Sequence, residues 1–288
     1  MIVPDVVIVG ITLGSIYTLM ALGLNVVYGV TRVFNYAQGA FFTWGAYLAW
    51  LFTVGRFNLP FGLAIPLTLV IMFFFGVAFE RAAIYPLRRL PNWQWSAFIV
   101  GLGFTFLLDN LALLIFGSRN KTLPYLLEGT FNFGGSAILK HNMLTFTAAI
   151  VIVIILTLFM NKVREGMCLR AVAQDPMGAQ ITGLRINRSY SLSFGLSALL
   201  GATSGILLAP RTLICPFVGW PVLIKAFVVM VFGGLGSFNG TLIAAFIMGL
   251  VEAVVTYHIG STWGLPAFLV ILSIVLIFRP RGLLGKWA

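Results

Sequence analysis

Three charged residues lie inside long apolar stretches of the chain: Asp109, Lys225 and Glu252. A charge at the centre of a bilayer costs about 2.5–3.5 kcal/mol on insertion scales, so such side chains face a bundle interior and find partners there. Lys225 and Glu252 fall at similar depth on neighbouring stretches, and we predict that they form an intramembrane ion pair. The pair is either structural or a gate that opens with a conformational change. Asp109 is expected to bond within the bundle.

A second group of polar residues is uncharged and lies near the junction of the first two apolar stretches. It contains Asn25, Tyr28, Asn35 and Gln38, and Phe41 follows directly. Amide and hydroxyl groups hydrogen-bond a zwitterionic solute without holding it tightly, and an aromatic ring offers apolar contact. We predict that these five residues line a translocation path. Hydrogen bonds between helices are the alternative interpretation.

The polar segment 162–188 carries the signature of a short capped helix. Asp175 is an N-cap, Pro176 occupies the first helical position, and Gly183 is suited to the C-terminal end. Ala179 and the glycine before it leave one face small enough to pack against another protein. We predict a docking element here, and a structured loop without a partner is the alternative.

The elements that position these residues are membrane helices. Of 288 residues, 60% are hydrophobic and only 9% are charged, whereas soluble domains carry about 25% charged residues. A helical crossing needs about 20 apolar residues. We predict an all-α, polytopic helical membrane protein with eight or nine membrane segments in one domain, 1–288. The apolar stretches are 6–30, 34–54, 59–79, 94–116, 143–161, 189–209, 221–235, 240–257 and 263–278.

The seventh stretch is too short to span comfortably, and a glycine-rich turn follows it. We therefore predict that 221–257 forms a helical hairpin with one short arm. Most of the 18 Lys and Arg residues lie on one set of alternate loops, which predicts a cytoplasmic C-terminus. The chain from Val6 onward is interpreted as a retained membrane helix. The basic residues form no stripe with interleaved aromatics, so membrane lipid is the expected partner and nucleic acid is not.

No catalytic or metal-binding pattern is present. The chain lacks a phosphate-binding P-loop, has no cluster of Cys or His with metal-ligand spacing, and places no histidine at helical depth to activate Ser237. We expect a non-enzyme without a cofactor of its own. An ion-coupled secondary transporter and a passive channel remain alternatives, although the former normally needs a relay of intramembrane carboxylates or histidines.

Four segments, in order along nearly the whole chain, resemble the branched-chain amino-acid permease family of ABC transporters, specifically its shorter H-type subunit. Gln38 stands where many members of the family have histidine, and Pro176 and Gly178 replace the usual acidic and alanine positions. The four segments are Leu24–Gly39, Arg170–Gly183, Lys225–Ser237 and Phe278–Gly285.

The resemblance implies a subunit of an ATP-driven importer in the bacterial inner membrane that works by alternating access. Its substrates would be branched-chain or other hydrophobic amino acids, with urea, short amides or other small solutes as alternatives. Its implied partners are a second related permease, two cytoplasmic ATPases that bind ATP and Mg, and an external substrate-binding protein. Contact with the ATPases would involve Arg170, Asp175, Ala179 and Gly183.

Overall fold

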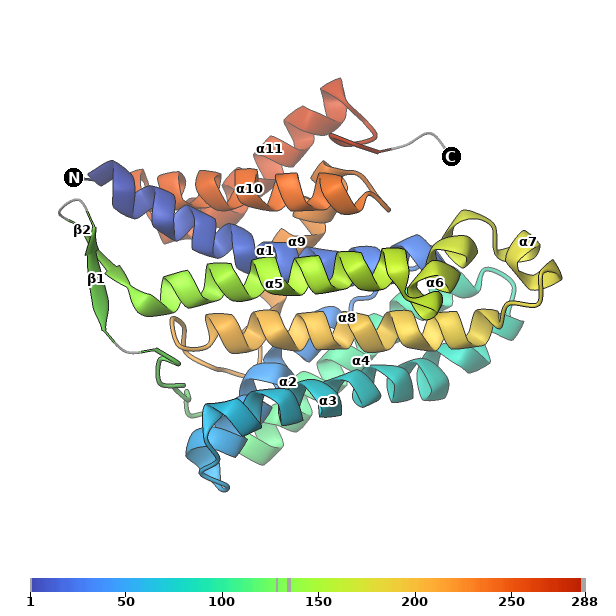
Figure 1. Cartoon of the computed structure of the whole chain (residues 1–288), viewed down its shortest axis with the longest axis horizontal. Coiled ribbons are helices and arrows are strands. Elements are labelled where there is room, and N and C mark those ends of the chain that lie inside the picture. Colours follow the sequence, from blue (N-terminus) through green and yellow to red (C-terminus); the bar gives the residue numbers. More distant parts are fainter. Residues whose placement is uncertain (1, 128, 134–135, 286–288) are drawn as a thin grey trace.

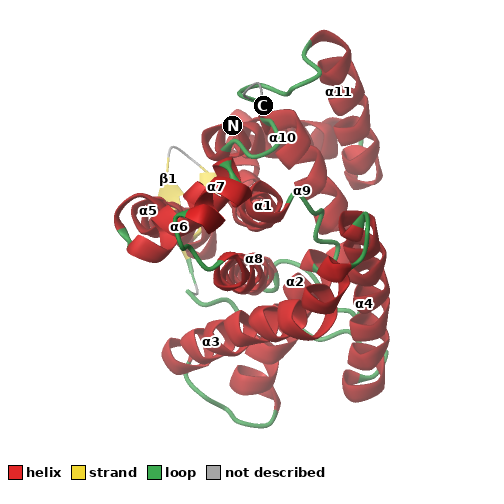
Figure 2. Cartoon of the chain, turned by 90° about the vertical axis from the view of Figure 1, so that its right-hand side faces the viewer, coloured by secondary structure: helices red, strands yellow, loops and turns green. Residues whose placement is uncertain are grey.

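The computed structural model describes residues 2–127, 129–133 and 136–285, and it is a bundle of long helices. α1 (Ile2–Thr31), α5 (Lys140–Lys162), α8 (Ile186–Leu208) and α10 (Phe238–His258) run along the long axis of the molecule (Figure 1). α8 lies at the centre, where α1, α2 and α3 pack against it (Figure 2). One large apolar core joins α1, α9 and α10.

The remaining elements surround this centre. α6 and α7 project from one end of the bundle (Figure 1). α3 continues through a π-helical and a 3₁₀ turn as far as Arg89. The bounds are α2 (Gln38–Trp50), a π-helical turn (Leu51–Gly55), α3 (Phe61–Phe79), α4 (Trp93–Phe116), β1 (Thr130–Phe133), β2 (Ser136–Leu139), α6 (Arg164–Gln174), α7 (Pro176–Ile181), α9 (Gly219–Gly233), a 3₁₀ turn (Ser261–Trp263) and α11 (Gly264–Phe278).

The prediction of a polytopic helical membrane protein is confirmed. Seven helical segments in the described part of the chain are long and apolar enough to cross a membrane. The predicted count of eight or nine crossings is not confirmed, because α2 and α9 are shorter, at 13 and 15 residues. Both short helices begin inside the bundle, where Gly39 of α2 and Gly219 of α9 touch through their backbones.

Glycines set the close approach of α1 to α10. A Cβ atom on Gly10 would lie 2.7 Å from Leu250, and one on Gly249 would collide with the backbone of Gly14. Small residues at such positions let helix backbones approach where lipid supplies no hydrophobic force between helices. Gly10 and Gly14 of α1 and Gly249 of α10 therefore allow this contact.

The α9–α10 hairpin has one short arm, as predicted, and the C-terminal segment closes its end. The amide of Leu283 donates to the carbonyl of Phe232 at 2.8 Å, and the amide of Leu284 donates to that of Gly233 at 3.1 Å. These bonds satisfy carbonyls that a helix C-terminus leaves without intrahelical partners. Gly234 has a positive φ of 106°, a backbone conformation that glycine adopts without strain.

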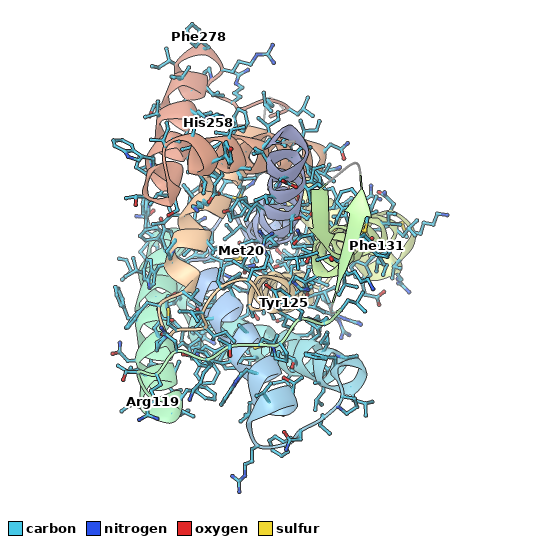
Figure 3. The ribbon with its side chains drawn as sticks, turned by 90° about the vertical axis from the view of Figure 1, so that its left-hand side faces the viewer. Met20, Arg119, Tyr125, Phe131, His258 and Phe278 are labelled. Atoms are coloured by element: carbon cyan, nitrogen blue, oxygen red, sulfur yellow. The ribbon has the colours of Figure 1, made fainter. Side chains whose placement is uncertain are left out.

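A small antiparallel hairpin, β1–β2, lies at the end opposite α7, and the helical interpretation did not anticipate it. It belongs to the polar connection between α4 and α5, which crosses that end of the bundle. Figure 3 shows Tyr125 on this connection, Phe131 on the hairpin and Met20 between the helices behind them.

Burial lowers the pKa of Arg211 in the loop after α8.

Candidate functional site

The segment α6–α7 is built from local capping interactions. The carboxylate of Asp175 accepts a hydrogen bond from the amide of Met177 at 3.0 Å, which satisfies a free donor in the first turn of α7. Pro176 occupies the first helical position. Gly183 ends the segment with φ +82°. The predicted capped helix is present, and it projects beyond the membrane-length helices (Figure 1).

The face of α7 that points away from the protein is apolar. Met177 is 74% exposed and Ile181 is 82% exposed, and their spacing of four residues places them on one side of the helix. Ala179 is buried beside Leu169 and Val172 of α6. The small side of Ala179 therefore packs against its own chain, and its predicted part in contact with a partner stays a prediction.

Sequence reasoning missed the Met177–Ile181 face because two apolar residues in a six-residue helix do not reveal which side is covered. Arg170 does not belong to this face. It lines a groove of about 520 Å³ with Arg32, which directly follows α1, and with Ser237 and Asn239 at the start of α10. The four residues predicted to couple to ATPases therefore differ in place. Asp175 and Gly183 flank α7, Ala179 lies within α7 on its buried side, and Arg170 belongs to α6.

Two of the predicted path residues form hydrogen bonds between helices. The amide nitrogen of Asn25 donates to the carbonyl of Ser237 at 2.9 Å and to the hydroxyl of Thr241 at 2.8 Å, and its oxygen accepts from the amide of Gly236 at 2.8 Å. Gln38 is fully buried and exchanges hydrogen bonds with the carbonyl and hydroxyl of Ser197. Both side chains join distant helices and have no free polar atom.

The other predicted path residues divide between a core and a small cavity. Phe41 is fully buried and packs edge-on against two rings of α3, Phe75 and Phe79. Asn35 lines a cavity of about 50 Å³, and its buried amide nitrogen has no hydrogen-bond partner. Tyr28 stacks on Phe34, whose ring also lines that cavity. The structure does not bring the five residues together around one opening.

Lys225 and Glu252 meet inside the bundle. Lys225 Nζ lies 2.5 Å from Glu252 Oε1, and the other carboxylate oxygen accepts a 2.5 Å hydrogen bond from the Tyr17 hydroxyl. The ammonium group also lies 5.8 Å from the centre of the Phe268 ring. The pair therefore ties α9 and α10 to α1, and the lysine contacts α11.

Tyr17 is a member of this cluster that sequence reasoning missed, because a tyrosine in an apolar stretch gives no sign of its partner. Asp109 bonds within the bundle, as expected: its Oδ2 accepts from the Trp220 indole nitrogen at 2.9 Å. No group of three or more potential metal ligands is found in the described part of the chain.

A family model and several known proteins match this chain. A family model described as the permease component of branched-chain amino acid transport systems matches residues 6–279. The high-affinity branched-chain amino acid transport permease BraD of Pseudomonas aeruginosa is 32% identical over 96% of this chain and 94% of the relative. LivH of Escherichia coli K12 is 31% identical over the same shares.

Two further matches have lower sequence identity to this chain. The permease protein LivM of Escherichia coli K12 is 26% identical over 95% of this chain and 68% of the relative. Among solved structures, PsaBC from Streptococcus pneumoniae in complex with Fab aligns with a TM-score of 0.52 and 12% identity, covering 96% of this chain and 92% of that one. The chain is thus a multi-pass membrane protein and belongs to the family of permease components of branched-chain amino acid transport systems.

Proposed function

We propose that this chain is one permease subunit of an ATP-driven importer for branched-chain or other hydrophobic amino acids. The observation that carries the energy-coupling part is the exposed apolar face of α7, formed by Met177 and Ile181. Two largely exposed apolar side chains on a rigidly capped helix are an unfavourable surface in water, and burial against a partner removes that cost.

The partner on this face is one of two cytoplasmic ATPase subunits, which bind and hydrolyse ATP with Mg. The α7 end of the bundle, with the C-terminal segment, then lies in the cytoplasm, and the chain sits in the bacterial inner membrane. The segment α6–α7 packs through Ala179 on the start of α8, the central helix. A displacement of α7 therefore reaches the helix against which α1, α2 and α3 pack.

The second half of the translocation path comes from a related permease subunit. Support for a heterodimer comes from the similarity of this chain to both LivH and LivM, which are two permease proteins of one organism. An external substrate-binding protein delivers the amino acid at the end that carries β1–β2. Affinity then resides in that protein, which agrees with a cavity at Asn35 of only about 50 Å³.

Reconstitution tests the proposal. The chain is assembled in proteoliposomes with the second permease, the ATPases and the binding protein encoded beside it, and uptake of leucine, isoleucine and valine is measured. We expect uptake that requires ATP and substrate-stimulated ATP hydrolysis. Uptake driven by a proton or sodium gradient without ATP would contradict the importer, and ATP-driven uptake of urea or short amides in place of leucine would contradict the substrate class.

A further inference from the structure

Five arginines surround the start of α8 and line two adjoining cavities. The first cavity, of about 270 Å³, lies between the start of α6 and the start of α8. The second, of about 830 Å³, lies between α8 and the ends of the α3 and α7 segments. The two share the lining residues Leu184, Arg185 and Arg188. The arginines are Arg81, Arg88, Arg164, Arg185 and Arg188.

Acidic partners neutralise only part of this charge. Glu80 is fully buried and pairs with Arg88, and it lies 3.8 Å from Arg81. Glu165 lies 3.4 Å from Arg188, in an exposed pair. The described part of the chain gives Arg164 and Arg185 no carboxylate partner. Five guanidinium groups therefore face two carboxylates, and the cavities are positive.

One of the five guanidinium groups, that of Arg88, is held in place by neighbouring side chains. Arg88 lies 4.2 Å from the centre of the Tyr190 ring and donates to the side-chain oxygen of Asn187 at 2.9 Å. Its Nε atom is buried and has no hydrogen-bond partner. Arg185 is the N-cap residue of α8, but its side chain makes no capping hydrogen bond. The N-terminus of this 23-residue helix carries a partial positive charge, which adds to the positive electrostatic potential of the cavities.

Positive cavities attract anions, and the position of these two indicates which kind of anion they bind. They lie where membrane-length helices end: α8 begins at Ile186 and the α3 segment ends at Arg89. Leu192, one helical turn or more into α8, lines the first cavity, and Trp93 lines the second. A tryptophan and arginines at one depth are typical of the interface between acyl chains and headgroups. Neighbouring α5 carries exposed apolar residues, among them Ile155 and Leu158.

We propose that these cavities bind the phosphate of an anionic phospholipid, with the headgroup at Arg164 and Arg185 and an acyl chain running along Leu192. Planar guanidinium groups match phosphate oxygens with paired hydrogen bonds. Basic pockets between membrane helices bind anionic headgroups for the same reason. A bound lipid would fasten α6, and with it α7, to the start of the central helix.

The first test measures lipid binding to the full chain purified in detergent. The probes are phosphatidylglycerol, phosphatidylcholine and inorganic phosphate, followed by native mass spectrometry. The variant Arg164→Gln/Arg185→Gln is compared with Arg56→Gln/Arg89→Gln, which removes the same charge from residues outside both cavities. Each arginine near a bilayer contributes a factor of about five in binding, so the first variant weakens phosphatidylglycerol binding by about 30-fold and the control leaves it unchanged.

The second test uses Cys168, which lines the first cavity. In a Cys215→Ser background it is the only thiol, because the chain has 2 cysteines. Phosphatidylglycerol is expected to slow alkylation of Cys168, whereas phosphatidylcholine and inorganic phosphate do not. Protection by millimolar phosphate equal to that by the lipid, equal binding of both lipids, or equal loss in both double variants would overturn the proposal.

Discussion

Removing either partner of the Lys225–Glu252 pair is expected to destabilise the bundle nearly as much as removing both. The side chains are 15% and 10% exposed, so solvent screens the pair little. Loss of one partner from a buried pair costs about 3–5 kcal/mol, because the remaining charge is left without compensation. In Lys225→Met the carboxylate of Glu252 retains only the Tyr17 hydroxyl. We expect a loss of about 3 kcal/mol for Lys225→Met and for Glu252→Gln.

The double variant Lys225→Met/Glu252→Gln leaves no buried charge at this site. Its loss should be smaller than the sum of the single losses by about 2 kcal/mol or more, the coupling expected of groups in one network. The assay is reversible unfolding of the purified chain in mixed micelles, with Lys162→Met and Tyr257→Phe as exposed controls within about 0.5 kcal/mol of wild type. Additive single losses, within about 0.5 kcal/mol, would refute the pairing as a source of stability.

Further substitutions test the packing and the path separately. Asn25→Ala removes the bonds that hold the α9–α10 turn, and its free energy of unfolding should fall by about 1–3 kcal/mol in the same assay. Gly249→Ala forces α1 from α10 and should cost about 1–3 kcal/mol, whereas Gly103→Ala, beside open space, should not. Gln38→Ala should lower stability without changing the KM for leucine uptake; a KM change at unchanged stability would place Gln38 in the path. Ala179→Leu should abolish ATP-coupled uptake, because the larger side chain displaces α7 from α6; wild-type uptake would contradict this positioning.

Apolar length and charge placement predict most of the bundle, because a lipid environment allows few alternatives to long helices. The capped α7 helix was also predictable, since Asp175, Pro176 and Gly183 act through bonds within a few residues. The α9–α10 hairpin with its one short arm was predictable from the glycine-rich turn that precedes Phe238. These features depend on local chemistry or on the bilayer, and both can be read from one sequence.

The rest depends on which helices become neighbours, and one sequence does not specify that. Asn25 and Gln38 are polar residues suited to a solute path, yet each satisfies its amide with a helix far away in the sequence. Ala179 packs against Leu169 and Val172 of its own chain, and its small size alone does not reveal this contact. Tyr17 becomes the third member of the ion-pair cluster only after α1 packs against α10.

The most direct measurement of the central claim is ATP-driven leucine uptake by the reconstituted complex carrying Met177→Ser/Ile181→Ser. The matched control is Met143→Ser/Ile259→Ser, which changes exposed residues of the same types at the other end of the bundle. A buried apolar side chain contributes about 1.5–3 kcal/mol, so loss of both contacts weakens docking by about 100-fold or more. We predict that the α7 variant loses uptake and bound ATPase while the control keeps both. Full uptake and full ATPase binding by the α7 variant would contradict the account.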